Sequence, residues 1–281
     1  MDEPAAGDCA AFTGFVIVSK RRNASIKISE ESKEPSDCTE RKIYFMKLAA
    51  DLHVHTIAST HAYSTVTEIA RHAADIGLSA VAITDHGIAL EDSPHIWHFE
   101  IMKSLPRELF GVRLLMGVEA NVQKGGSLDM PERILKQLDW VVASMHKSTA
   151  VMDSPEDVTE AWLKVVDNPL VDLLGHIGTP RYVCDYEAVI KACAEKHKLI
   201  EINANTFRVR PESAGNCRKV AELCRRYEVP VCVDSDAHFH LHVGQPGGAG
   251  KMLEAIRFPE ELILNASYDR LLAYLQSRPS R

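Results

Sequence analysis

Seven short apolar runs alternate with amphipathic stretches along most of this 281-residue chain. Each run has the length of a β-strand, and most of the stretches between them carry apolar residues at helical spacing. This alternation is typical of βα units, whose strands form a parallel sheet. The runs cover residues 48–54, 80–84, 113–118, 140–145, 171–174, 199–203 and 230–233. Seven such units can close a barrel or form an open wound sheet, and the pattern alone leaves both arrangements open.

Helices are expected between these strands. The spacing of apolar residues predicts helices over residues 66–76, 131–137, 155–166, 186–197 and 214–227, and another over residues 260–275. No Gly-x-Gly-x-x-Gly or Gly-x-x-x-x-Gly-Lys sequence follows any of the strands, so a nucleotide-phosphate loop is not supported. The glycines within residues 244–250 are interpreted as a flexible turn into the last helix.

The first 45 residues differ from the regular body. Residues 15–19 and 24–28 have the composition of two short strands, whereas residues 29–41 are charged, contain proline and lack apolar periodicity. Because Met46 stands just before the first body strand, residues 1–45 are interpreted as a disordered extension or as a segment outside the native translation start. The predicted organisation is therefore an extension, residues 1–45, and one folded domain, residues 46–281.

Composition narrows the class of protein. Apolar residues make up 46% of the chain, which is enough for a large globular core. The seven cysteines are scattered without a Cys-x-x-Cys pair, so neither a disulfide framework nor a zinc ribbon is indicated. There is no signal-peptide pattern and no apolar run of the roughly 20 residues that a membrane span needs, which predicts a cytoplasmic protein. The net charge of −7 argues against binding of long nucleic acid.

Candidate metal ligands follow nearly every predicted strand. The carboxyl ends of the strands in barrels and wound sheets meet on one rim, where such enzymes place their chemistry. His53 and His55 share one side of their strand and can hold one ion. The ligand types on this rim are His53, His55, His61, His86, Glu119, His146, His176, Asp236 and His238. Imidazoles with carboxylates suit zinc, manganese or iron, and nine ligands are too many for one ion, so two or three metals are predicted.

These residues, in this order, resemble the motifs of the PHP (polymerase and histidinol phosphatase) family, and most of all its YcdX-like stand-alone phosphatases. The motifs are His53-x-His55, Thr84-Asp85-His86-Gly87, Glu119, His146, His176 and Asp236-x-His238. The resemblance spans about residues 46–275, and all nine ligand positions have a matching residue type. It implies an α/β fold, a distorted seven-stranded (β/α)7 TIM-like barrel, that hydrolyses phosphate esters with three divalent ions. Zinc is the first expectation, with manganese or iron as alternatives.

The resemblance also distributes the ligands. It implies that the first metal is held by His53, His55, Glu119 and Asp236. The second metal would be held by His61, His86 and His238. Glu119 would bridge to the third metal, which His146 and His176 complete. Residues 1–45 have no counterpart in the resemblance.

Clustered metals can hydrolyse a phosphate ester without a protein nucleophile. Two ions roughly 3.5 to 4 Å apart can share a hydroxide at neutral pH while they bind the phosphoryl oxygens. Three divalent ions with two carboxylates leave a local charge of about +4, so an acidic protein can still attract an anion. Arg181 and Arg210, which follow the fifth and sixth strands, are candidates for substrate binding.

Outer residues are expected to orient the ligands, because a metal-bound imidazole usually donates its second N–H to a carboxylate or carbonyl. Asp51 and Asp85 are the main candidates, and Asp234 is a third. The alternative for each is a surface or capping aspartate. His240 and His242 come just after the last ligand. They are candidates for lining the mouth of the site, and the alternative is that they face solvent.

Hydrolysis of small phosphate monoesters is the favoured function, because a stand-alone barrel of this size resembles the small-phosphatase branch. Histidinol phosphate is one candidate substrate. A phosphodiesterase or nuclease acting on short nucleic acids is the alternative, and an amidohydrolase ranks third because its ligand order usually differs. A barrel that holds metals for structure or regulation, with little turnover, is the alternative outside enzymes. Analogy with the resembled branch implies a homo-oligomer, a trimer.

Overall fold

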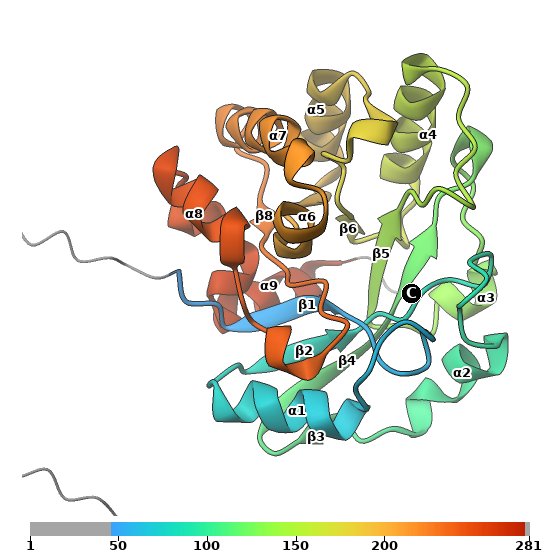
Figure 1. The fold of residues 1–281 in the computed structure, drawn as a ribbon, viewed down its shortest axis with the longest axis vertical. Coiled ribbons are helices and arrows are strands. Elements are labelled where there is room, and N and C mark those ends of the chain that lie inside the picture. Colours follow the sequence, from blue (N-terminus) through green and yellow to red (C-terminus); the bar gives the residue numbers. More distant parts are fainter. Residues whose placement is uncertain (1–45, 279–281) are drawn as a thin grey trace, which may run out of the picture. The chain divides into compact units, whose positions relative to one another are not determined.

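Seven parallel strands form a curled sheet in the order β1-β2-β4-β5-β6-β7-β8, with helices along its outer side (Figure 1). The strands are β1 (Ala50–Val54), β2 (Ala80–Ile83), β4 (Val112–Asn121), β5 (Trp140–Ser144), β6 (Leu173–Leu174), β7 (Leu199–Glu201) and β8 (Val231–Cys232). Six of the predicted runs contain one of these strands, and β4 extends beyond the predicted run 113–118 at both ends. A short strand that was not predicted, β3 (Glu108–Leu109), pairs antiparallel with β4. The predicted α/β class and distorted seven-stranded barrel are confirmed.

This computed structural model describes residues 46–278. The strands predicted over residues 15–19 and 24–28, and the whole extension of residues 1–45, lie outside the described residues. Within the described range, no helix combines the length and the apolar composition that a bilayer crossing requires.

Nine α-helices are present in the described part of the chain. They are α1 (Val66–Asp75), α2 (Ile96–Ile101), α3 (Glu132–Leu135), α4 (Pro155–Asp167), α5 (Tyr186–Lys196), α6 (Ala204–Val209), α7 (Ala214–Arg226), α8 (Gly247–Ala255) and α9 (Tyr268–Ser277). Helices α2, α6 and α8 were not predicted. The turn expected over residues 244–250 is wrong, because α8 begins at Gly247. The single helix expected over residues 260–275 is also wrong, because two 3-10 turns precede α9.

Local sequence explains where the outer helices begin. The Thr65 hydroxyl accepts a hydrogen bond from the Glu68 amide, and the Glu68 carboxylate accepts one from the Thr65 amide, which together cap α1. The Ser154 hydroxyl accepts a hydrogen bond from the Asp157 amide and caps α4, with proline at the first helical position. These caps fix the starts of helices whose apolar faces cover the sheet.

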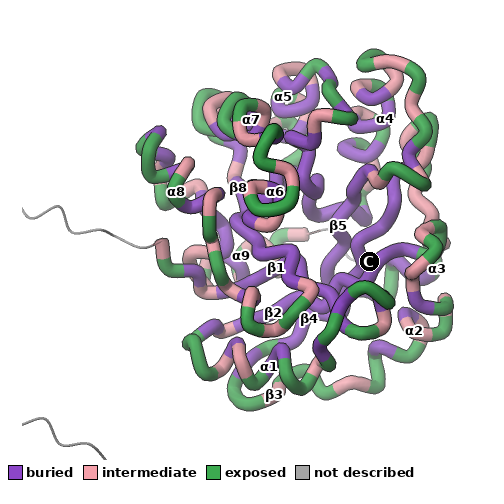
Figure 2. The backbone as a smooth tube through the Cα atoms, in the orientation of Figure 1, coloured by how far each residue is buried: buried purple, intermediate pink, exposed green. Residues whose placement is uncertain are grey.

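The interior of the barrel is divided into two layers. The lower layer is an apolar cluster that contains Leu52, Ala82, Leu115, Trp140, Val142, Leu173, Leu199 and Cys232. Strand alternation then brings a second set of side chains inward nearer the carboxyl ends, and that set is polar. On β4, for example, Leu115 belongs to the apolar cluster while Glu119 and Asn121, on the same face, lie above it. The seven parallel strands are buried along nearly their whole length (Figure 2), and Arg113 on β4 is the exposed exception among their residues.

A break in the alternation of β1 aims its histidines inward. Leu52 packs in the interior cluster, whereas Val54 packs in the outer core between sheet and helices. The pairing of β1 with β2 shifts register between Asp51 and Val54, as expected of a β-bulge. His53 and His55 therefore both reach the interior, where their ring centroids lie 5.1 Å apart.

The seam between β1 and β8 closes the barrel. Val54 of β1 forms a bridge with Ala237, in the segment that follows β8, and next to it the His55 amide donates to the Ala237 carbonyl at 2.9 Å. Lower down, the buried Asn265 side chain fills the seam. Its amide donates to the carbonyls of Ala50 (3.0 Å) and Val233 (2.8 Å), and its oxygen accepts from the Val233 amide. The distortion of the barrel is located at this junction.

Candidate metal centre

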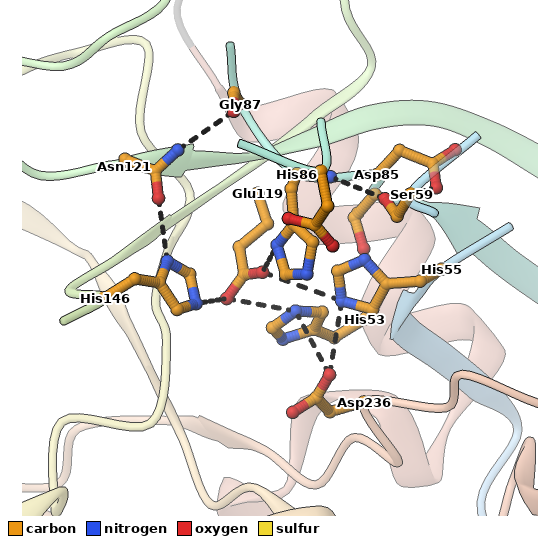
Figure 3. Close-up of polar contacts among 12 residues, drawn as sticks. His53, His55, Ser59, Asp85, His86, Gly87, Glu119, Asn121, His146 and Asp236 are labelled. Atoms are coloured by element: carbon orange, nitrogen blue, oxygen red, sulfur yellow. Dashed lines mark hydrogen bonds and ion pairs between the residues drawn. The ribbon is translucent and has the colours of Figure 1, made fainter. Parts of the chain in front are cut away.

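Nine predicted ligands meet at the carboxyl end of the barrel. Figure 3 shows His53, His55, His86 and His146 pointing at Glu119, with Asp236 facing the first two from the opposite side. His176 also reaches the same carboxylate, with its Nε2 at 3.0 Å from Glu119 Oε1. His61 and His238 stack on one another at the open side, with ring centroids 4.4 Å apart. The structure thus brings together every ligand that the sequence predicted.

Distances to the two carboxylates define the centre. Glu119 lies between the ligands that the resemblance assigns to different ions: its Oε1 is 3.3 Å from His53 Nε2 and 3.4 Å from His146 Nε2. Asp236 Oδ1 is 3.2 Å from His55 Nε2. Four groups have donor atoms mutually within 4.8 Å: His53, His55 and Asp236; His55, His86 and His238; His61, His86 and Asp92; and His86, Glu119 and His146. The Glu119 carboxylate therefore lies at the centre of the cluster, within 3.4 Å of the rings of His53, His86, His146 and His176.

Divalent ions fit this donor set because several buried atoms lack any other partner. The ring nitrogens His53 Nε2 and His55 Nε2, both nitrogens of His86, and Glu119 Oε2 make no hydrogen bond in the described structure. His86 Nδ1 lies 2.7 Å from Glu119 Oε2 without hydrogen-bond geometry. Leaving a buried donor or acceptor unpaired is costly, so convergent unpaired lone pairs are what a metal site requires.

Electrostatics in the metal-free centre favour paired charges. Burial opposes charge on Glu119, but the imidazoles of His146, His53 and His86 outweigh it and hold the pKa of its carboxyl well below the usual range. Burial also opposes charge on His53, yet nearby carboxylates, Glu201 first, raise its pKa well above the usual value. For His55, burial and its histidine neighbours lower the pKa to about 3. His55 is thus a neutral imidazole, the form that binds a metal.

Three residues that the sequence analysis missed fix the orientation of ligand rings. Glu201 Oε1 lies 2.7 Å from His53 Nδ1, and its Oε2 accepts a hydrogen bond from the His176 amide at 2.7 Å. Asn121 Oδ1 lies 2.7 Å from His146 Nδ1, and Asp92 contacts His61 Nδ1. The contacts with the rings of His53, His146 and His61 are all made at Nδ1, which leaves Nε2 of each ring to bind an ion. Alternation along β4 could have revealed Asn121, which lies two residues after the predicted ligand Glu119, whereas β7 carries no predicted ligand that would mark its inward face.

Two ligands also occupy unusual backbone conformations. His176 has φ of 29° and Asp236 has φ of 50°, in the left-handed region that most L-residues avoid. Asp236 Oδ2 also accepts hydrogen bonds from the side chains of Asn203 and Asn205, at 3.2 and 3.3 Å. Backbone strain of this kind is concentrated at functional sites, where the surrounding contacts maintain it.

The PHP domain model matches residues 51–205, which is more than half of the chain. The chain belongs to the PHP family. It is 42% identical over 235 residues to a probable phosphatase of Clostridium novyi, covering 83% of this chain and 96% of that protein. A probable phosphatase of Caldanaerobacter subterraneus is 44% identical over 241 residues, covering 84% of this chain and 94% of that protein.

Solved structures agree with the PHP fold. Histidinol phosphate phosphatase of Lactococcus lactis, in complex with zinc, L-histidinol and phosphate, superposes with a TM-score of 0.53 at 16% identity and covers 76% of this chain and 95% of that one. A chain of an archaeal ribonuclease P with mature tRNA gives 0.51 at 14% identity, covering 80% and 91%. At such low identity these likenesses concern the fold alone.

The contacts of Asp51 and Asp85 differ from the expected orienting role. Asp51 accepts hydrogen bonds from the Ser235 and Gly244 amides at the seam. Asp85 binds the Thr56 amide and hydroxyl and the Ser59 hydroxyl, which holds the loop after β1. Asp234 accepts from the Leu52 amide and from Asn265. Within residues 46–278 no imidazole of the predicted ligands donates to these carboxylates, which accept instead from backbone amides, from two hydroxyls and from the Asn265 side chain.

The two predicted substrate-binding arginines lie at different places around the PHP centre. Arg210 lines the cavity of about 390 Å³ that opens onto the ligands, together with Arg208. Arg181 does not line it and belongs to a neighbouring cavity. His242 contacts the Arg208 guanidinium at 3.0 Å, whereas His240 binds Ser64. Arg208 is thus a residue of the mouth that was not singled out as a substrate ligand.

Proposed function

We propose that this protein is a metal-dependent phosphatase that hydrolyses small phosphate monoesters with three divalent ions, zinc first, and manganese or iron as alternatives. The observation that carries the proposal is the convergence of nine imidazole and carboxylate side chains, among which buried atoms of His53, His55, His86 and Glu119 have no hydrogen-bond partner in the described structure. The relatives named probable phosphatases support the reaction class. The zinc, L-histidinol and phosphate bound by the Lactococcus protein support the metal and the kind of substrate.

Residues at different positions in the site would have different roles in metal binding and in substrate binding. Glu119 and Asp236 would supply the two carboxylates, and Glu119 would bridge ions; its Oε1 lies 3.3 Å from His53 Nε2 and 3.4 Å from His146 Nε2, which supports that role. Divalent ions held there would polarise the phosphoryl oxygens. They would also lower the pKa of water, so that hydroxide is available at neutral pH to attack phosphorus. Arg208 and Arg210 line the cavity outside the ligands, where a guanidinium can bind phosphoryl oxygens in a bidentate manner. Asn205 orients Arg208, because its Oδ1 accepts from Arg208 Nη2 at 2.8 Å.

Monoesters are preferred over diesters for two reasons. The cavity at the ligands has a volume of about 390 Å³, which suits a small ester rather than a long strand. The chain also has a net charge of −7, whereas a binder of long nucleic acid usually carries an extended basic face. Assembly as a trimer and a cytoplasmic location stay predictions.

A substrate panel tests the proposal. Phosphate release from p-nitrophenyl phosphate, glycerol 3-phosphate and histidinol phosphate is compared with cleavage of bis(p-nitrophenyl) phosphate and a dinucleotide, with metal content measured on the same sample. We expect turnover of monoesters by the metallated protein and none after chelation. Cleavage of the diesters alone would replace the proposal by the phosphodiesterase. A fully metallated protein that turns over none of these esters would favour the structural or regulatory alternative.

A further inference from the structure

A second cavity, of about 330 Å³, opens beside the metal centre. It shares two lining residues with the cavity at the ligands, the ligand His146 and Arg210, so the two spaces are neighbours. Three cationic side chains line it: Lys147, Arg181 and Arg210. One acidic residue, Glu212, lies on the same wall. The cavity therefore carries an excess of positive charge in a protein whose net charge is −7.

The three cations come from loops that follow successive strands. Lys147 follows β5, Arg181 lies in the turn after β6, and Arg210 follows α6, beyond β7. Arg210 Nη1 donates to the Thr179 hydroxyl at 3.2 Å, which is a neutral partner. Within residues 46–278, none of the three forms an ion pair with a carboxylate. Glu212 offsets only part of this charge, and since like charges repel one another, a bound anion would relieve the remaining repulsion.

The scissile phosphate does not require this second cavity. It would lie at the metal centre, whose own cavity is lined by Arg208 and Arg210. Lys147 and Arg181 line only the second cavity. Arg210 stands between the two spaces, so an anion in the second cavity would lie within one small molecule's length of the ligand His146.

We propose that the second cavity is a subsite for another anionic group on the substrate, so that preferred substrates carry a phosphate or a carboxylate besides the scissile phosphate. The inference rests on the proposed function and specifies its substrate class. Arginine forms bidentate, charge-assisted hydrogen bonds with either group, and lysine adds a point charge. Molecules with one phosphate and a neutral remainder would leave the subsite without its anion and react less efficiently.

Paired substrates test the subsite and separate the two anionic groups. Glucose 1,6-bisphosphate is compared with glucose 6-phosphate, and 3-phosphoglycerate with glycerol 3-phosphate, as ratios of kcat/KM. The variant Lys147→Gln/Arg181→Gln is compared with a matched control, Lys251→Gln/Arg257→Gln, whose residues are exposed at α8 and just beyond it and form no ion pair with any residue of 46–278. We expect the wild type and the control to favour the doubly anionic member of at least one pair. The subsite variant should lower that ratio about tenfold through KM.

Three results would overturn the subsite. An equal fall in kcat/KM for both members of each pair would mean that Lys147 and Arg181 bind the scissile phosphate. An unchanged ratio in the variant would mean that they are surface charges only, and a wild type without preference in either pair would mean the same. If the wild type turns over no ester, the proposed function fails separately, and calorimetric binding of glucose 1,6-bisphosphate decides. Weaker binding by the subsite variant then supports the subsite, and equal binding overturns it.

Discussion

Glu201 connects two ligands that the resemblance assigns to different ions, through His53 Nδ1 and the His176 amide. The nine ligands themselves could be predicted because each stands at or just beyond the end of an apolar run. That rule does not identify Glu201, because the residue lies inside the run 199–203, where the sequence predicts only a strand. Its role depends on which face of β7 turns inward, and only the assembled barrel determines that face.

Replacing Glu201 with glutamine should impair metal binding while preserving the fold. The backbone N–H of His176 requires an oxygen acceptor, so the side-chain oxygen of the glutamine in Glu201→Gln would keep that contact. Its side-chain NH2 group would then face His53 Nδ1. That contact makes Nδ1 an acceptor and moves the proton to Nε2, which can then no longer bind an ion. We expect about 10- to 100-fold weaker binding of one ion, measured by competitive chelator titration. Glu195→Gln, exposed on α5, is the control, and equal affinities in both variants would contradict the assignment.

Asp92 should matter for a different ion. His61 is half-exposed, with 52% of its side chain accessible, so the contact of Asp92 with His61 Nδ1 supplies much of its orientation. We expect Asp92→Asn to weaken the binding of one ion by roughly tenfold or more without displacing the other two. Metal stoichiometry by mass spectrometry at limiting metal measures this. Loss of all three ions together, or of none, would contradict the role of Asp92 in orienting His61 for one ion.

At the scale of elements, the strands were predictable because parallel strands buried on both faces are continuous apolar runs. The helices α2, α6 and α8 were not, since the first two have six residues and α8 begins with two glycines. Packing explains one of these glycines: a Cβ at Gly248 would lie 2.6 Å from the Phe207 Cβ, so α6 and α8 approach closely only with glycine there. The helix predicted over residues 260–275 is interrupted because Asn265 must enter the seam.

Asn265 should therefore contribute strongly to stability. Asn265→Ala would leave the Ala50 carbonyl and the Val233 amide and carbonyl without this partner inside the protein. Buried groups left unpaired are costly, so we expect a loss of about 3 kcal/mol in the free energy of unfolding. Urea denaturation of the metal-free protein provides the measurement. Gln137→Ala, on the surface, should change it by less than about 0.5 kcal/mol, and a variant at Asn265 as stable as this control would refute the role of the seam.

At the scale of the whole molecule, the barrel holds an apolar layer below a polar one, and burial in the polar layer shifts the pKa of several of its groups. Burial opposes charge on His53 and His86, but neighbouring carboxylates raise the pKa of both in the metal-free protein. Their protonated forms therefore stabilise the metal-free fold below the unfolded imidazole pKa of about 6.5. That contribution is lost as pH rises through the higher folded pKa values.

Metal binding should consequently release protons. An ion needs the neutral imidazole, so it displaces the protons that His53 and His86 carry, and the apparent affinity should rise with pH until both are deprotonated. Calorimetry near neutral pH in two buffers of different ionisation enthalpy measures the released protons. Binding heats that do not depend on the buffer would show that these imidazoles are already neutral.

The most direct test of a metal-dependent phosphatase is an add-back titration. The protein is stripped with a chelator, and zinc, manganese or iron is then added in measured equivalents while bound metal and phosphate release from one monoester are followed on the same sample. We predict no turnover without metal, and turnover that rises with bound metal and saturates near three ions per chain. Turnover that survives complete removal of metal, or a chain with its metals restored and no turnover, would contradict the account.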